Sequence, residues 1–430
     1  MKKRFDYSWV IVALCFLAVC TSLGLCSSGR TMYLKAITEA LDIKRGAFSL
    51  NDTFRFVTTT IMNLYFGTLV NKFGTKKLIC AGFTCLIGFA LINSVAESLI
   101  MFYVAGVLLG IGLSWTTTTM MSAVVNNWCT KNKGAITGAI LAANGVGGAI
   151  AAQILSPIIF EEGNPFGYRN SYRLVALVLA IVLALIVVLF RERPKGAEKK
   201  ELARKKTHKM RGTGWVGMDY SVAKKKPYFY LALLCMMFTG MSLQGLSGIA
   251  TPHMYDLGLD TDYVADLLTV SSLCLVGSKF FAGFMYDKTG IKVTMNICLS
   301  SAFLSLIGLV LISNTPIGRA IALVRIVFSA IALPLETVML PLFASEFFGN
   351  KSFAKIVGIF AAASTAGFAL GSPFANLCFD IFGNYNIAFI IFGALMAFVT
   401  VSLQIVVRSA HRDRRIIESQ EAETVAEVSE

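Results

Sequence analysis

The chain has 430 residues, of which 56% are hydrophobic and 15% are charged, and its formal net charge at pH 7 is +14. Soluble domains average about 45–50% apolar and about 25% charged residues, so this composition excludes an ordinary soluble globular protein and indicates a polytopic membrane protein. The positive charge does not indicate nucleic-acid binding, because the basic residues lie between apolar runs, where they anchor a protein against anionic lipid headgroups.

Spanning helices need about 20 apolar residues each. Six such runs precede the linker and predict helices at 8–29, 47–70, 77–95, 98–125, 134–159 and 171–190. Six more follow it and predict helices at 228–251, 263–286, 292–313, 318–345, 354–378 and 386–407. The fold class is therefore an all-α membrane protein with twelve transmembrane helices.

The same pattern gives the domain organisation. An amino-terminal half at 1–190 and a carboxyl-terminal half at 228–408 flank a basic cytoplasmic linker at 191–227. The tail at 409–430 turns acidic after Arg415 and lacks the apolar content to pack, so it is expected to be disordered.

The distribution of basic residues predicts the orientation, because cytoplasmic segments carry an excess of lysine and arginine. With the amino terminus inside, the inner segments hold 29 of the 39 Lys and Arg residues and the outer loops hold 7. Both termini are therefore expected in the cytoplasm, with the protein in the cell membrane. The other three basic residues lie within spans, at Arg55, Lys279 and Arg325.

A glycine-rich turn occurs after the second predicted helix of each half. The first copy, GTLVNKFGTKK, runs from Gly67 to Lys77, and the second, GFMYDKTGIK, begins 216 residues later at Gly283. Glycine permits sharp reversals and close packing, and charges beside it can hold helix ends together. The predicted gating residues are Gly67, Asn71, Gly74, Gly283, Asp287 and Gly290.

Two sets of six helices, a basic central loop and these paired turns resemble the major facilitator superfamily. The resemblance implies two parallel repeats, with a substrate bound near mid-membrane between them and moved by alternating access. Asn71 stands where the family usually has aspartate, whereas the second turn keeps Asp287. The gating ion pairs are therefore expected mainly in the carboxyl half.

A narrower resemblance concerns the junction of the fourth and fifth helices. The run from Asn127 to Gly134 leads into GAILAANGVGGAI and is similar to the oxalate/formate antiporter and monocarboxylate transporter group. In that group a cation four positions before the first glycine of the second turn contacts the substrate carboxylate. The resemblance thus implies a substrate-binding role for Lys279.

Other readings of Lys279 stay open. An ammonium within an apolar span is costly, so Lys279 can instead be a structural cation paired with Glu336, or it can reach the membrane surface. Glu336 lies between Pro334 and Pro341, which suits either a moving helix or a static polar network.

The remaining candidate substrate-binding residues are Arg30, Tyr33, Thr118 and Asn144. Arg30 is equally compatible with an interfacial anchor. Arg55 follows Asp52 by three residues, which predicts an ion pair within one helix. Arg325 and Glu336 lie three turns apart and need partners elsewhere.

The sequence has no nucleotide-binding loop, no HExxH motif and no CxxC pair, so we expect no enzyme activity, no cofactor and no metal. The leading hypothesis is a monomeric secondary transporter for a small carboxylate, with a coupled ion or counter-substrate. A single central cation favours a monocarboxylate. The alternatives are a transporter for a neutral or cationic solute and a transport-like sensor. Symport, antiport and uniport all stay open.

Overall fold

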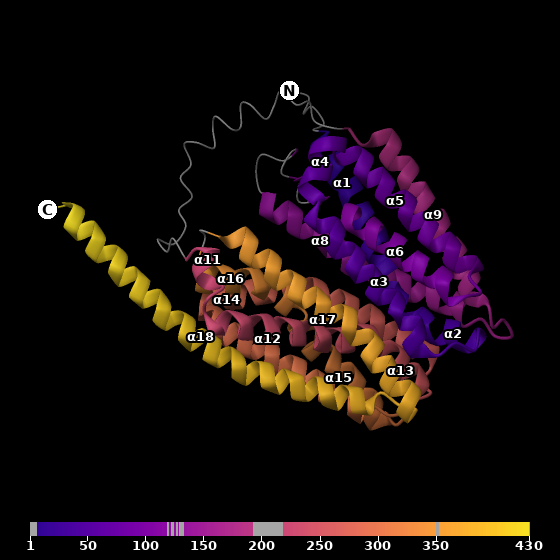
Figure 1. The fold of residues 1–430 in the computed structure, drawn as a ribbon. Helices are drawn as coiled ribbons and strands as arrows, with labels where there is room; N and C mark the ends of the chain where they lie inside the picture. The colour runs from indigo at the N-terminus through magenta and orange to yellow at the C-terminus, as the bar shows by residue number, and fades with distance from the viewer. Residues whose placement is uncertain are drawn as a thin grey trace, which may run out of the picture.

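The computed structural model describes residues 7–117, 120–121, 124–125, 128, 133–191, 218–349 and 352–429. Throughout these residues the secondary structure is helical, joined by short turns. Figure 1 shows two bundles side by side, the first half in indigo to magenta and the second in pink to yellow.

The first half begins with a helix that changes geometry along its length and then continues through six further helices. Its elements are α1 (Ser8–Val19), the π-helical η1 (Cys20–Ser28), the 3₁₀ segment η2 (Gly29–Met32), α2 (Tyr33–Ala40), α3 (Arg45–Leu64), α4 (Phe66–Phe73), α5 (Thr75–Val95), α6 (Leu99–Thr116), α8 (Lys133–Ile159) and α9 (Gly167–Leu189). The predicted first span at 8–29 therefore extends to Ala40.

The second half repeats this plan after a short helix. Its elements are α11 (Tyr220–Ala223), α12 (Pro227–Gln244), the π-helical η3 (Gly245–Ile249), α13 (Ala250–Asp256), α14 (Thr261–Leu311), α15 (Pro316–Ala332), the π-helical η4 (Leu335–Met339), α16 (Leu340–Phe348), α17 (Phe353–Phe382) and α18 (Asn386–Ser429). η3 follows α12 as η1 follows α1, so both halves widen their first helix at a similar place.

Ten helices of the described residues are long and apolar enough to cross a membrane, by length and composition alone. The two predicted spans missing from this set correspond to α3 and to the first part of α14. These two carry charged residues such as Asp52 and Lys279, which lower their hydropathy. Of the predicted substrate-binding residues, Lys279 lies on one of these two spans, whereas Arg30, Asn144 and Glu336 lie on helices among the ten.

The glycines that end the two repeated turns have the backbone conformation that requires them. Gly74 has φ 81° and Gly290 has φ 77°, values that side chains with a Cβ rarely adopt. Gly290 interrupts α14, so the predicted boundary between the spans at 263–286 and 292–313 is confirmed there.

Glycine contacts hold each half together at related places. A Cβ on Gly147 of α8 would overlap the backbone of Cys20, and one on Gly24 would overlap the backbone of Gly147. In the second half, a Cβ on Gly367 of α17 would overlap the carbonyl oxygen of Met237 in α12. Backbones approach this closely only where small residues line the interface.

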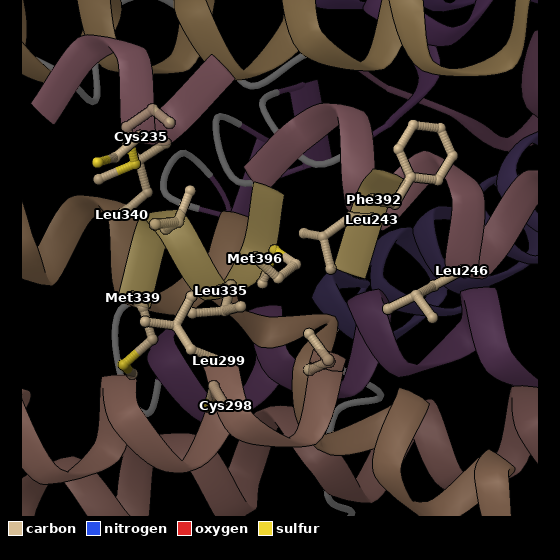
Figure 2. Close-up of a cluster of buried hydrophobic side chains, with 14 of the residues drawn as sticks. Cys235, Leu243, Leu246, Cys298, Leu299, Leu335, Met339, Leu340, Phe392 and Met396 are labelled. Atoms are coloured by element: carbon tan, nitrogen blue, oxygen red, sulfur yellow. The ribbon is translucent and has the colours of Figure 1, made fainter. Parts of the chain in front are cut away.

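Each half has its own apolar core. Figure 2 shows the centre of the second core, where side chains of α12, η3, α14, η4, α16 and α18 converge, among them Leu243, Leu299, Met339 and Met396. Leu335 and Met339 of η4 belong to this cluster, so the π-helical segment packs against a well-filled core.

The predicted disordered tail at 409–430 requires a correction. α18 continues as one helix from Asn386 to Ser429 and extends away from the bundle in Figure 1. The first part of this stretch packs against the bundle, since Ala410 is buried and Asp413 pairs with Lys226 at 2.7 Å. The stretch is also rich in alanine, glutamate and arginine, which are strong helix formers.

Candidate functional site

A cavity of about 280 Å³ lies between the two halves. Its wall comes from η1, η2 and α3 of the first half and from α12, η3, α13, α14, α15 and α17 of the second. Hydroxyl and amide groups line much of it: Ser27, Ser28, Thr31, Gln244, Ser247, Thr251, Ser271, Ser272 and Ser329. Pockets for drug-sized ligands have volumes of about 300–1,000 Å³, so this one suits a small solute.

The first half places two guanidinium groups in this wall around one carboxylate. Arg30 forms an ion pair with Asp52 and donates to Asn51 Oδ1 at 2.8 Å. Arg55 Nη2 lies 3.2 Å from Asp52 Oδ1, which confirms the predicted ion pair within one helix. Two guanidinium groups on this side of the cavity therefore pair with the one carboxylate of Asp52.

The second half adds Arg325 of α15 to the same wall. Arg325 is only 6% exposed, and its Nε and Nη1 atoms are buried without a hydrogen-bond partner in the part of the chain that the structure describes. Of the three guanidinium groups in the wall, Arg30 and Arg55 pair with Asp52, whereas Arg325 has no ion pair among the described residues. The cavity is therefore suited to an anion.

One end of the molecule joins the two halves through a second cluster, which we call the latch: Lys35, Arg45, Asp256, Asp380 and Tyr385. Arg45 at the start of α3 binds both carboxylate oxygens of Asp256, with Nη2 to Oδ1 at 2.8 Å. Its guanidinium also lies 4.1 Å from the Phe379 ring centroid and donates to Tyr385 at 3.1 Å. This bidentate and stacked geometry is specific to arginine.

Asp380 strengthens the latch through the backbone of α3. Its carboxylate accepts from the amide of Arg45 at 3.1 Å and from that of Gly46 at 2.7 Å. A carboxylate of the second half therefore caps a helix of the first, where the free amides and the helix dipole favour negative charge.

Residues at equivalent places of the two repeats also meet near the latch. Thr31 donates to Thr251 at 3.3 Å, and the Lys35 ammonium donates to the Tyr255 carbonyl at 2.8 Å. Both pairs are 220 residues apart, close to the 216-residue offset of the repeated turns. The first helices of the two halves thus face each other across the axis that relates the repeats.

Comparison with known families agrees with this architecture. The family model described as Major Facilitator Superfamily matches residues 12–351 and, in a second match, 244–428. The chain belongs to the Major Facilitator Superfamily.

Relatives within the superfamily are distant transporters. The sialic acid transporter NanX of Escherichia coli K12 is 24% identical over 83% of this chain and 84% of its own length. The oxalate:formate antiporter of Oxalobacter formigenes is 24% identical over 92% and 90%. Monocarboxylate transporter 13 of Bos taurus is 25% identical over 76% and 72%. The predicted resemblance to this group is confirmed.

A solved structure supports the superfamily fold. A variant of the nucleoside transporter NupG aligns with a TM-score of 0.76 over 93% of this chain and all of its own length, at 13% identity. At this identity the likeness concerns the fold alone.

Lys279, the predicted substrate-binding cation of this superfamily member, is half-buried on α14 and is absent from the wall of the central cavity. Glu336 of η4 lies within electrostatic reach of Lys279 and of Arg55. The cations that influence Glu336 therefore lie on other helices, α14 and α3, and neither forms an ion pair with it among the described residues.

The other predicted site residues occupy different places. Arg30 lines the central cavity. Tyr33 is buried in the first half, where it bonds Ser171 at 2.6 Å and stacks on Tyr172 with centroids 4.1 Å apart. Asn144 accepts from Ser28 at 3.2 Å, behind the wall. Thr118 lies outside the described residues.

The repeated turns lie away from both the cavity and the latch. Asn71 is exposed near the end of α4, and Asp287 and Gly283 belong to α14, where Asp287 is exposed. A Cβ on Gly283 would meet nothing within 4 Å, so this glycine does not serve the close packing that its motif suggested. Gly67 lies within α4.

The latch and Arg325 were not predicted as site residues. Arg45 counted only as a loop charge because its partner Asp256 is 211 residues away in sequence. One sequence feature could have indicated Arg325 as a site residue, because it is a lone arginine within an apolar span. The sequence does not show, however, that this span lines a cavity.

Proposed function

We propose that this superfamily member is a secondary transporter that carries a small carboxylate across the membrane by alternating access. The observation that carries the proposal is the cavity wall, which holds three guanidinium groups. Arg30 and Arg55 share the carboxylate of Asp52, and Arg325 has no ion pair among the described residues. A carboxylate bound there supplies negative charge and accepts hydrogen bonds from guanidinium groups.

The latch supports the alternating-access part of the proposal. It joins the halves at the end where α2 and α13 meet, with the cavity beside it. With both termini in the cytoplasm of a cell-membrane protein, as the 29 to 7 distribution of basic residues predicts, the latch closes the outer side. The proposed state is therefore inward-facing, with Asp287 and its turn acting as a gate in the opposite state.

The substrate preference has to be tested with both monocarboxylates and dicarboxylates. The preference for a monocarboxylate rested on a single central cation, but the wall of the cavity holds three guanidinium groups. More than one cation can accommodate either a monocarboxylate with a coupled anion or one dicarboxylate.

The first test is thermal unfolding of the purified protein with formate, acetate, lactate, oxalate and succinate, with acetamide and xylose as uncharged controls. A ligand at 100 times its Kd stabilises the native state by about 2.7 kcal/mol, so at least one carboxylate is expected to raise the melting temperature. Stabilisation by xylose alone would favour the neutral-solute alternative, since hydroxyl groups also line the wall.

Uptake into proteoliposomes then separates transport from sensing. The carboxylate that stabilises the protein is expected to accumulate inside vesicles that contain the protein and not inside empty vesicles. Binding without uptake would favour the transport-like sensor.

A second prediction concerns Lys279 and Glu336, which lie within electrostatic reach of each other. The nearness of Glu336 supports a structural role, so Lys279→Ala is expected to destabilise the protein by about 1–3 kcal/mol because it removes a positive charge that acts on the Glu336 carboxylate. Adding Glu336→Gln is expected to restore the melting temperature, because the double variant has no unpaired charge.

The alternative role of Lys279 gives a different result in the same experiment. If its ammonium binds the substrate carboxylate, Lys279→Ala keeps the melting temperature and loses the ligand-induced shift, and the double variant does not recover it.

A further inference from the structure

We propose that Arg325 is the residue that binds the substrate carboxylate. The inference rests on the proposed carboxylate transport and adds to it a single anchoring side chain, contributed by the second half. Four observations carry it: the burial of Arg325, its unpaired nitrogen atoms, its position in the cavity wall, and the partners already held by the other cations.

The surroundings of Arg325 provide no counter-charge. Its stem packs across Gly308 of α14, where the nearest side-chain carbon would lie 3.1 Å from a Cβ built on that glycine. His253 is within electrostatic reach, but its Nε2 is bonded to the Leu309 carbonyl at 2.9 Å and it carries no negative charge. No carboxylate lies within ion-pair distance of Arg325 among the described residues.

A buried guanidinium without hydrogen bonds is unfavourable by several kcal/mol. Such a group persists in a membrane protein where function requires it, most often beside a solute pathway. Arg325 is 6% exposed and lines the cavity, so an anion that enters the cavity can reach it.

The other cations near the site are already engaged. Arg30 and Arg55 each keep one unpaired Nε, but both form an ion pair with Asp52. Lys279 interacts with Glu336. Pairing with Arg325 is therefore expected to give a substrate carboxylate more binding free energy than pairing with any of these other cations.

The chemistry of the site matches one carboxylate group. A guanidinium presents two parallel N–H groups that fit both oxygens of a carboxylate. Ser329, one helical turn further along α15, lines the same cavity and adds a hydroxyl donor. Arg55 of the first half lines the same cavity, so an anion held by Arg325 is also attracted toward the other half.

The test compares Arg325→Gln and Arg325→Lys with Arg319→Gln. Arg319 is a matched control, because it lies on the same helix but is exposed and hydrogen-bonded to Asn314 at 2.9 Å. Binding of the panel carboxylates, measured by thermal shift and by isothermal titration, is expected to weaken about 10- to 100-fold in Arg325→Gln, less in Arg325→Lys, and not in Arg319→Gln.

The melting temperature of the ligand-free protein is a second measurement, and Arg325→Gln is expected to raise it although the same substitution weakens ligand binding. Arg325→Gln removes an uncompensated buried charge, so the empty variant is expected to melt at a higher temperature than the wild type while its ligand-induced shift is lost. A merely structural arginine would give a lower melting temperature instead, and that result would overturn the proposal.

The outcomes also separate this inference from the function on which it rests. If no carboxylate stabilises the wild-type protein, the proposed carboxylate transport fails. If a carboxylate stabilises wild type and Arg325→Gln equally, transport stands and the role of Arg325 is refuted. Equal binding of acetate and acetamide by Arg325→Gln, with preference for acetate in the wild type, supports the anchor directly.

Discussion

Replacing Arg45 by alanine is expected to open the end of the molecule that the latch holds closed. The Arg45 side chain is 7% exposed and that of Asp256 is 17% exposed. Removing one partner of a buried ion pair is unfavourable by about 3–5 kcal/mol, because the other charge is left buried. A change of that size shifts a two-state equilibrium by more than about 100-fold.

The measurement uses a single cysteine at Ser247, which lines the cavity on η3, in a background without the native cysteines. An impermeant thiol reagent applied outside cells is expected to label it slowly in the latched protein and at least about tenfold faster in Arg45→Ala.

Arg169→Ala is the matched control for the latch. Arg169 pairs with Glu97 at 3.5 Å, but both lie in the first half and the Glu97 side chain is 75% exposed. Surface ion pairs contribute about 0–1 kcal/mol, so labelling should stay at the wild-type rate. Equal labelling of Arg45→Ala and the wild type would refute the latch, and labelling only from the inner side would refute the proposed orientation.

Gly367→Ala is expected to destabilise the second half by about 3 kcal/mol or more. The added Cβ would overlap the Met237 carbonyl oxygen, and backbone cannot move aside as a flexible side chain does. Gly147→Ala is expected to have the same effect in the first half, where the added Cβ meets the backbone of Cys20.

Gly358→Ala provides the comparison on the same helix. A Cβ at Gly358 meets nothing within 4 Å, so alanine should be neutral or stabilising by up to about 1 kcal/mol through its higher helix propensity. Thermal unfolding of the purified variants measures all three. Similar losses for Gly358→Ala and Gly367→Ala would show that helix contacts are not the cause.

The sequence predicted the features that depend on local chemistry. Apolar runs of spanning length gave the two halves, the turn motif identified Gly74 and Gly290, and the spacing of Asp52 and Arg55 gave their ion pair. Each of these needs information from only a few neighbouring residues.

The features that the sequence did not predict depend on which distant residues meet. The latch joins Arg45 to a residue 211 positions away, and the significance of Arg325 lies in the absence of a partner within a cavity that two halves build together. The resemblance favoured Lys279, yet its role as a substrate ligand stays a prediction, because the cavity wall holds other cations.

The π-helical segments η1 and η3 have a mechanical consequence. A π turn contains one residue more than an α turn and is less stable. Returning it to α geometry would rotate the helix beyond it by about 100°, the angle of one residue in a helix with 3.6 residues per turn. η1 ends at Ser28, two residues before Arg30, and η3 ends at Ile249, two residues before Thr251. We infer that the hinge of each half lies inside its first helix. A single change from π to α geometry would then rotate the residues of the cavity wall and of the latch together. Amide hydrogens of η1 that exchange no faster than those of α1 would exclude such a hinge.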